Sequence, residues 1–360
     1  MGLPLLSEEY GHLGAGGSEL QAALLAKALA RRGFRVSLVV NDYGQADGAR
    51  WHGVTTLKAY RPDAGIPIVR FAHPRWTSTW AAMRRADADI YYVNCQGMQV
   101  AQAVLFAQAH RRKTVYWVAS DSDCSPETLV IEYWRDRKLY EYGLRRVNLV
   151  LAQTAEQQHA LRRNFGVDSR LMESLVDFPS AVRTRDARDF DVLWVGNFRA
   201  LKRPELLFEL AKRLPGLSFH MVGGPAHGSL EVYAAALRAA EALPNVRFHG
   251  PVPYQRVGEL YERARVFVST SSVEGLPNAY LQSWARGTPV VAFLDPERMI
   301  ETQGLGRAVS SLDEMHTAVA ALSAPDSLEW AASSARCIEY MSGRYGESNV
   351  VSRYVETLYA

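Results

Sequence analysis

Cysteine is scarce in this sequence, since its 360 residues include only Cys95, Cys124 and Cys337. Three scattered cysteines without a CxxC spacing argue against a disulfide framework or a zinc site, and they favour a reducing cytoplasm. The sequence also lacks an apolar run of about 18 residues and a basic N-terminus followed by an apolar stretch. We therefore expect neither a transmembrane helix nor a secretory signal. The formal net charge of +3 gives no reason to expect a nucleic-acid partner.

Basic residues stand side by side at several places in the N-terminal half: Arg84-Arg85, Arg111-Arg112-Lys113, Arg145-Arg146 and Arg162-Arg163. Such pairs are most often solvated helix ends, which is the interpretation we favour. An anionic membrane surface would attract them at about 1 kcal/mol per well-placed charge. Peripheral contact of the N-terminal domain with the inner membrane face therefore stays open for an otherwise cytoplasmic protein.

Short apolar segments alternate with helical stretches along the chain, which is typical of parallel sheets covered by helices. The length suits two domains of about 150 to 200 residues each. We predict an α/β protein with Rossmann-like domains at residues 1–176 and 191–345, a linker at 177–190, and a last helix at about 346–360 that could pack back on the first domain. The predicted strands are Phe34–Val40, Ile90–Val93, Thr114–Val118, Leu149–Ala152, Val192–Val195, Ser218–Val222, Val246–Phe248, Val266–Ser269 and Val290–Phe293, and Met1–Leu6 is a short, poor candidate for another.

A first glycine cluster, Gly14–Gly17, stands directly before Ser18. Ser18 with Gln21 three residues later is a capping pattern, which predicts a helix that ends at Gly33. Backbone amides at such a helix start suit a phosphate or a sugar hydroxyl. The cluster lacks the spacing of a dinucleotide fingerprint, so a tight turn without a ligand is an equally good interpretation.

A second cluster, Gly196–Pro204, follows the predicted strand Val192–Val195 and contains Arg199 and Lys202. Ligands bind at the carboxyl ends of the strands in open α/β sheets, and cations there are well placed to neutralise a diphosphate. Basic residues near a helix start are otherwise ordinary surface charges.

A third cluster, Ser269–Gln282, leads through Glu274 and Gly275 into a helix that we expect to stop at Gly287. Backbone amides at the start of this helix would face a ligand, while Pro277 has no N–H and shapes the turn. As alternatives, Glu274 merely complements the helix dipole, worth about 0.3–1 kcal/mol, and Gln282 faces solvent.

In this order the clusters resemble the retaining glycosyltransferases of the GT-B fold, of the family-4, group 1 kind. The segments that carry the resemblance are Gly16–Glu19, Gly196–Lys202, Val222–Gly224, Val246–Val252 and Glu274–Asn278. The resemblance implies two Rossmann-like domains that face each other across a cleft and hold a nucleotide diphosphate-sugar there.

The resemblance also implies roles for the matching residues. Lys202, with Arg199 or with Asn197 where the family often has arginine, would hold the donor diphosphate, and Glu274 would meet hydroxyls of the transferred sugar. Further implied contacts to the donor are Gly16, Gly17, Gly223, Gly250, Val252, Gly275, Leu276, Pro277 and Gln282. Gln282 stands where the family commonly has a glutamate that binds the ribose, and an amide there would bind more weakly.

The sequence departs from the family where the strand Thr114–Val118 ends, because a histidine beside the sugar is common there and this chain has none. Asp121 or Asp123 would have to take over its hydrogen bond, unless both only form the turn. His12 and His73 are alternative candidates, although a structural role is the more usual one for each.

The letters of Asp121-Ser122-Asp123 match a DxD metal motif, but the resemblance gives them no metal role. We therefore expect no metal and no cofactor, only a nucleotide-sugar donor and an unknown acceptor, either a glycan, a glycolipid or a small molecule. The resemblance implies retention of anomeric configuration and a place in polysaccharide biosynthesis. A non-catalytic nucleotide-sugar-binding protein and a GT-B-type sugar-nucleotide epimerase remain as alternatives.

Overall fold

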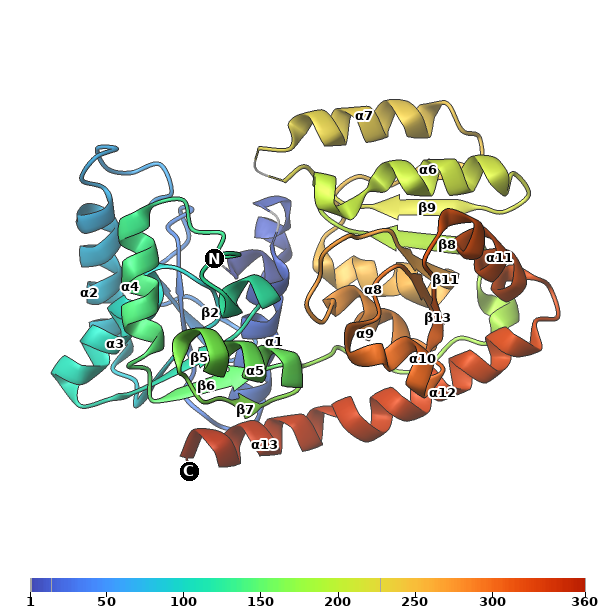
Figure 1. The fold of residues 1–360 in the computed structure, drawn as a ribbon. Coiled ribbons are helices and arrows are strands. Elements are labelled where there is room, and N and C mark those ends of the chain that lie inside the picture. The colour runs from blue at the N-terminus through green and yellow to red at the C-terminus, as the bar shows by residue number, and fades with distance from the viewer. Residues whose placement is uncertain (1, 14, 227, 360) are drawn as a thin grey trace. The chain divides into compact units, whose positions relative to one another are not determined.

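The structure is a computed structural model that describes residues 2–13, 15–226 and 228–359. The chain divides into two compact units (Figure 1): unit 1 is Met1–Leu175 with Glu347–Ala360, and unit 2 is Val176–Gly346. Unit 1 thus combines the predicted first domain with the last helix, and unit 2 combines the predicted linker with the second domain.

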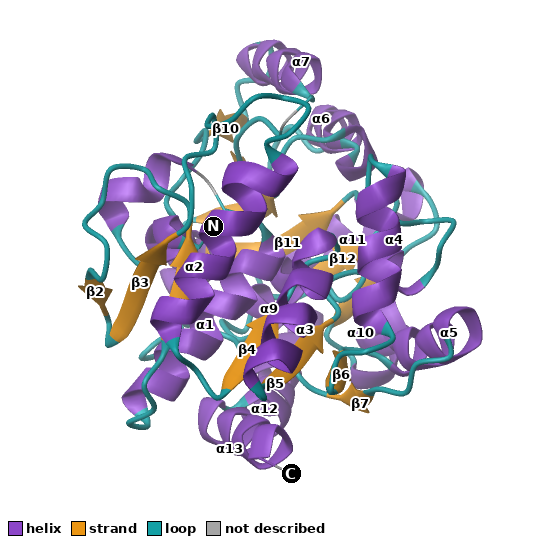
Figure 2. Ribbon diagram, turned by 90° about the vertical axis from the view of Figure 1, so that its left-hand side faces the viewer, coloured by secondary structure: helices purple, strands orange, loops and turns teal. Residues whose placement is uncertain are grey.

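Unit 1 contains two sheets with helices packed against them (Figure 2). One sheet has the order β1-β3-β2, in which β2 is antiparallel to β3, and the other has four parallel strands in the order β4-β5-β6-β7. The strands are β1 (Ser37–Val40), β2 (Arg50–Trp51), β3 (Val54–Lys58), β4 (Ile90–Val93), β5 (Lys113–Trp117), β6 (Leu149–Ala152) and β7 (Arg170–Leu171). The α-helices are α1 (Gly17–Arg31), α2 (Thr77–Ala86), α3 (Met98–His110), α4 (Trp134–Leu144), α5 (Ala155–Phe165) and α13 (Glu347–Tyr359).

The first residues of unit 1 do not form the strand considered at Met1–Leu6. Leu3–Leu5 is a 3-10 turn with Pro4 inside it, and proline cannot donate to a strand ladder. Leu3, Leu5 and Leu6 are all buried, so the segment contributes to the core with side chains rather than to a sheet with its backbone.

Helix α1 begins one residue before Ser18, which is therefore not its cap. Gly16 occupies the N-cap position, and its amide donates to the Glu19 carboxylate over 2.6 Å. Gln21 is buried instead and exchanges two hydrogen bonds with the Leu175 backbone, at 2.9 and 2.8 Å. The predicted capping pair is thus wrong, because Gln21 has a partner 154 residues away that the local pattern does not reveal.

The C-terminal helix α13 belongs to the core of unit 1. Its buried residues Val350, Val351 and Tyr354 pack in one cluster with Leu25 of α1 and Trp117 of β5. This apolar contact joins the end of the chain to the first domain, because the apolar face of an amphipathic helix is stable only where it is buried.

Unit 2 contains one sheet of six parallel strands in the order β10-β9-β8-β11-β12-β13. The strands are β8 (Phe190–Val195), β9 (Phe219–Val222), β10 (Val246–Phe248), β11 (Ala264–Ser269), β12 (Val290–Ala292) and β13 (Gly306–Ala308). The α-helices are α6 (Pro204–Arg213), α7 (Leu230–Glu241), α8 (Tyr254–Arg263), α9 (Asn278–Trp284), α10 (Met299–Gln303), α11 (Leu312–Ser323) and α12 (Leu328–Tyr345).

Both faces of this sheet are covered. Along β8, Val192 and Trp194 pack in the cluster that includes helices α6, α7 and α11, whereas Leu193 and Val195 pack in the cluster that includes α8 and α9. Burial on both faces explains why β8, β11 and β12 are largely apolar and why the sequence predicts them, whereas β13, the short strand Gly-Arg-Ala, was not predicted. The predicted α/β class with parallel sheets is confirmed.

Candidate functional site

The loops after β8 and β11 lie together at one edge of the unit 2 sheet. The two strands are parallel neighbours in that sheet, so their carboxyl ends meet at the same edge. The Ser272 amide donates to the Leu201 carbonyl over 2.8 Å, and the Thr270 hydroxyl donates to the Lys202 carbonyl over 2.6 Å. The second and third sequence clusters therefore form one structure.

The side chains of Lys202 and Glu274 form an ion pair within this structure. They are 72 residues apart in the sequence, and their side chains are only 23% and 17% exposed. The low exposure of both side chains reduces the screening of the pair by water and salt. The structure thus brings together the cation and the acid that the sequence analysis selected from separate clusters.

Arg203 supports the Lys202 loop, a role that the sequence analysis missed. Its guanidinium donates to the carbonyls of Thr270 and Ser271, at 2.7 and 3.2 Å, and lies 4.6 Å from the centre of the Phe293 ring. Arg203 also has a left-handed backbone with φ of 45°, which turns the chain into α6. Its position directly before Pro204 is the signal that could have identified it.

Asn197 and Arg199 are exposed on either side of a buried residue in the same loop. Phe198 is fully buried against Trp194 and Phe248, so its neighbours on both sides point away from the core. Within the described residues neither exposed side chain has an ion pair. Both are therefore available to a ligand at this loop.

Glycines let the loops after β8, β9 and β10 approach one another. Gly196 donates to the Val222 carbonyl and Gly223 donates to the Gly250 carbonyl, each over 3.0 Å. A Cβ atom on Gly223 would lie 1.9 Å from the Gly196 carbonyl oxygen, so no other residue fits there. Gly250 has φ of 68°, and the half-buried Val252 that follows packs on the core.

The third cluster runs through Gly275, Leu276 and Pro277 into α9. Leu276 is 7% exposed and Pro277 is the N-cap residue, so the apolar side chains anchor the loop. No hydrogen-bond partner of the Gly275 or Leu276 amide is present in the part of the chain that the structure describes. The helix ends at Trp284, and Gly287, which follows Ala285 and Arg286, has φ of 65°.

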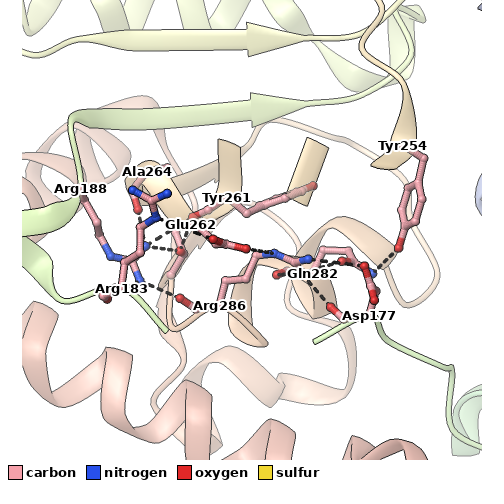
Figure 3. A network of polar contacts seen from close by, with 10 residues as sticks. Asp177, Arg183, Arg188, Tyr254, Tyr261, Glu262, Ala264, Gln282 and Arg286 are labelled. Carbon is pink, nitrogen blue, oxygen red and sulfur yellow. Dashed lines mark hydrogen bonds and ion pairs between the residues drawn. The ribbon is translucent and has the colours of Figure 1, made fainter. Parts of the chain in front are cut away.

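Gln282 faces a buried polar network rather than solvent (Figure 3). Its side-chain amide donates to the Tyr254 hydroxyl over 3.1 Å, and its side-chain carbonyl accepts from Arg286 over 2.8 Å. Arg286 also donates to the Asp177 carbonyl over 2.9 Å, and Gly258 leaves the room that its guanidinium occupies. The ribose role of Gln282 stays a prediction.

Arg188 is a second buried cation of this network that the sequence did not reveal. It is 1% exposed, and its guanidinium donates to the carbonyls of Ala264 and Arg286 and to the Thr288 hydroxyl, each over 2.6 Å. Burial lowers the pKa of Arg188 to about 10. Its partners lie beyond the carboxyl end of α9 and at β11, so Arg188 fixes the segment that leads into β8 (Figure 3).

In unit 1, the predicted residues lie where α1 begins and where β4 and β5 end. Gly16 caps α1 and Gly17 is its first residue. The Asn94 side chain, directly after β4, donates to the Ser18 carbonyl, so the end of β4 is held at the start of α1. Gly14 lies outside the described residues.

Asp121 and Asp123 follow β5 and differ completely in environment. Asp123 is 1% exposed and accepts hydrogen bonds from Tyr116, the Ala119 amide and Gln96, at 2.9 to 3.0 Å. Burial raises the pKa of the Asp123 carboxyl. Asp123 therefore holds the loop in shape.

Asp121 is exposed at the same edge, and the buried side chain of Gln157 donates to its carboxylate over 2.9 Å. Asp121 is thus the acid of this loop that a substrate could reach. Among the described residues no group of three or more His, Cys, Asp or Glu side chains is placed to hold a metal.

Of the two alternative histidines, His73 lies away from these edges. His73 is exposed before α2, where its ring meets the Thr77 hydroxyl at 2.8 Å. The side chain of His12 lies outside the described residues.

The paired basic residues of unit 1 have acidic neighbours. Arg85 pairs with Asp47, Arg112 with Asp87 and Asp89, Arg145 with Glu141, and Arg162 with Asp168. One cation of each basic run is paired in this way, and peripheral membrane contact stays a prediction. No helix among the described residues combines the length and apolarity needed to cross a membrane.

Comparisons with known proteins agree with this geometry. The family model described as Glycosyltransferase Family 4 matches residues 15–173, and the one described as Glycosyl transferases group 1 matches residues 189–324. Among curated proteins, the D-inositol 3-phosphate glycosyltransferase of Geodermatophilus obscurus is 34% identical over 170 residues, covering 40% of this chain and 37% of that protein. The enzyme of the same name from Mycobacteroides abscessus is 35% identical over 104 residues, covering 28% and 24%. The matches thus span well under half the length of these relatives.

Solved structures show the fold over nearly the whole chain. Sucrose-phosphate synthase from Thermosynechococcus elongatus has a TM-score of 0.77 at 17% identity, covering 95% of this chain and 93% of the other. HepE of Anabaena, solved in complex with UDP and glucose, has a TM-score of 0.73 at 16% identity, covering 95% and 96%. Two family models in sequence and the GT-B fold of these structures lead to one conclusion: the chain belongs to the family-4, group 1 glycosyltransferases.

Proposed function

We propose that this protein moves a sugar from a nucleotide diphosphate-sugar to a glycan, glycolipid or small-molecule acceptor, with retention of anomeric configuration and without a metal ion. The observation that carries the proposal is the pairing of Lys202 and Glu274, which come from the loops after two neighbouring strands. Membership of the glycosyltransferase family supports it.

The pair leaves binding capacity on both partners. An ammonium group has three N–H donors, and Glu274 uses one of them, so Lys202 can still donate to diphosphate oxygens. The second carboxylate oxygen of Glu274 can accept from a sugar hydroxyl. Arg199, exposed in the same loop, adds a second cation for the diphosphate.

These groups suit the charge that develops in sugar transfer. The bond between the anomeric carbon and the diphosphate oxygen breaks, and the leaving diphosphate gains negative charge while a new bond forms to the acceptor oxygen. The acceptor proton passes to the departing phosphate. Lys202 and Arg199, positioned before the reaction, would stabilise this charge without a divalent ion.

The first test is nucleotide binding followed by turnover. UDP, GDP and ADP are screened for the rise in melting temperature that a specific ligand causes by mass action, with UDP as the first choice because HepE was solved with it. The matching nucleotide-sugar is then incubated with acceptors, including polyol phosphates, in buffer with chelator. Nucleotide release and a product with retained configuration are expected. Abolition by chelator, restored by a divalent ion, would remove the metal-independent mechanism.

A non-catalytic nucleotide-sugar-binding protein is the second candidate. The engagement of Gln282 by Tyr254 and Arg286 favours it, as does the lack of a histidine after β5. Tight nucleotide-sugar binding without release of nucleotide over any acceptor would support this candidate and contradict the transferase.

A further inference from the structure

Arg203 connects the ends of three neighbouring strands of unit 2, β8, β11 and β12. It belongs to the segment after β8, and its guanidinium donates to the carbonyls of Thr270 and Ser271 in the loop after β11, at 2.7 and 3.2 Å. The same guanidinium lies 4.6 Å from the ring centre of Phe293, the residue directly after β12. We call these three contacts the arginine clamp. One side chain thus joins three loops that are far apart in the sequence.

The clamp satisfies backbone groups that water reaches poorly. Thr270 is 0% exposed and Ser271 is 3% exposed, so their carbonyls depend on donors from the protein. A buried carbonyl that loses its donor is costly, and the loop after β11 would have to change its course to find another one. The course of this loop therefore depends on the guanidinium of Arg203.

The clamp lies next to both partners of the ion pair. In one loop it follows Lys202 directly, and in the other it precedes Glu274 by a few residues. The Thr270 hydroxyl donates to the Lys202 carbonyl over 2.6 Å, and the Ser272 amide donates to the Leu201 carbonyl over 2.8 Å. These bonds cross between the same two loops, so the clamp fixes the backbone from which both charged side chains project.

Arg203 makes the clamp from a strained backbone. Its φ of 45° and ψ of 54° are left-handed, a conformation that glycine adopts freely and that costs free energy for a residue with a Cβ atom. Such a conformation persists only where the surrounding structure determines it more strongly than the local preference does, as is common at functional sites. In Arg203, the contacts of the guanidinium are the interactions that offset this cost.

We infer that Arg203 is a positioning residue, which sets the place of Lys202 relative to Glu274 through the clamp and does not itself contact the donor. This role rests on the proposed transferase function. A cation stabilises the charge on a leaving diphosphate best when it is fixed before the reaction. A loosened Lys202 can still bind a diphosphate, but it has to be ordered again in each transition state. Loss of the clamp should therefore reduce the rate more than the affinity.

The test compares three replacements of Arg203 by steady-state kinetics with the nucleotide-sugar and by calorimetry with UDP. Arg203→Ala removes the clamp and keeps the strain, whereas Arg203→Gly removes both. In each, kcat should fall by about tenfold to a hundredfold, while the Kd for UDP should rise by less than about fivefold. Arg203→Lys should fall between these variants and wild type, because an ammonium group cannot reproduce the planar fork.

Two further measurements separate positioning from a merely structural role. Added guanidinium ion, far below denaturing concentrations, should restore part of the turnover of Arg203→Ala, and tetramethylammonium, which has no N–H donor, should not. Arg111→Gly is the matched control for strain, because Arg111 is an exposed residue with φ of 55° at the end of α3 in unit 1. Its replacement should leave kcat unchanged. Circular dichroism checks the fold, and Arg203→Lys decides the question if another variant does not fold.

Hydrogen exchange tests the clamp without a donor. Protection of the Ser272 amide should fall by about tenfold or more in Arg203→Ala and Arg203→Gly, and it should be unchanged in Arg111→Gly. Unchanged protection in all variants would refute the clamp. A wild-type protein that never turns over would refute the transferase, whereas a loss of Ser272 protection without Arg203 would still support the clamp.

Two kinetic outcomes would overturn the positioning role. Full turnover in Arg203→Gly would show that the guanidinium is not needed once the backbone strain is removed. An increase in the Kd for UDP as large as the decrease in kcat would make Arg203 a direct ligand of the diphosphate instead.

Discussion

The glycine-rich loops of unit 2 and the edge of unit 1 that carries Asp121 are both located at the carboxyl ends of parallel strands, yet they are built differently. In unit 2, backbone groups do most of the work: Gly196, Gly223 and Gly250 are joined through main-chain hydrogen bonds, and glycine is required where two loops nearly touch. From this frame Lys202 and Glu274 project as a charged pair.

The edge of unit 1 relies on side chains instead. Gln96 and Asp123 hold the loop after β5, Gln157 holds Asp121, and Asn94 reaches the start of α1. A site held by backbone geometry imposes short glycine-rich patterns on the sequence, whereas a site held by side chains can be rebuilt from many residue types. For the proposed transferase, this difference matches a constant donor and a variable acceptor.

The largest expected effect is on turnover, and it compares one substitution in each region. Lys202→Ala should lower turnover by about 10²–10³-fold, because it removes a fixed donor to the leaving diphosphate. Asp121→Asn should lower turnover by roughly tenfold or less, since Asp121 is exposed and an amide keeps its hydrogen bond to Gln157 as acceptor. Steady-state kinetics with the nucleotide-sugar measures both, and circular dichroism checks the fold. A larger loss for Asp121→Asn than for Lys202→Ala would reverse the comparison.

The next effect tests the backbone frame of unit 2. Gly223→Ala places a methyl group 1.9 Å from the Gly196 carbonyl oxygen, and both loops must move to accept it. The free energy of unfolding of unit 2 should fall by about 3 kcal/mol. Gly216→Ala is the matched control, because its Cβ would meet nothing within 4 Å. Denaturant titration of both variants measures this loss. Equal unfolding midpoints for the two variants would show that the loop contact is not rigid.

A fall in pH should change the stability of the two units in opposite directions. Burial, and next the neighbouring His249, lowers the pKa of His220 to about 4. In the unfolded chain the ring has its ordinary pKa of about 6.5. As the pH falls from about 6.5 to about 4, the unfolded state therefore binds a proton that the folded state does not bind. Unit 2 loses roughly 2 kcal/mol of stability over this range. Burial raises the pKa of Asp123, so folded unit 1 takes up that proton before the unfolded chain does and gains stability on acidification.

Hydrogen exchange at β9 and at β5, corrected for intrinsic rates, resolves the two units in one experiment. His220→Gln should flatten the acid loss of protection at β9, and His316→Gln on α11 is the matched control. A wild-type protein whose two units lose protection in parallel would argue against both assignments.

The sequence predicted what is local or apolar, and it missed what depends on distant partners. The strands Ile90–Val93, Leu149–Ala152 and Val246–Phe248 are confirmed to the residue, because each begins and ends with an apolar residue. The capping role of Gln21 was wrong because its partner is Leu175. The roles of Arg203 and Arg286 depend on contacts 67 and 109 residues away.

At Gln282 the sequence and the structure suggest different roles for the side chain. Its replacement by glutamate has the smallest expected effect. The family pattern implies a ribose contact there, but the side chain already donates to Tyr254 and accepts from Arg286. In Gln282→Glu the carboxylate can keep Arg286 and accept from the Tyr254 hydroxyl, which burial keeps protonated by raising its pKa. Both partners thus hold the new side chain as they hold the old one, and the affinity for UDP should change by less than about threefold.

Calorimetry with UDP and with 2′-deoxy-UDP checks this prediction in both proteins. If the network holds, the ratio of the two affinities is the same in wild type and Gln282→Glu. A tenfold gain for UDP alone would mean that the glutamate leaves Tyr254 and binds the ribose. The network around Arg286 would then be a state of the empty donor site, and the family pattern, rather than the contacts of Gln282, would describe how the nucleotide is held.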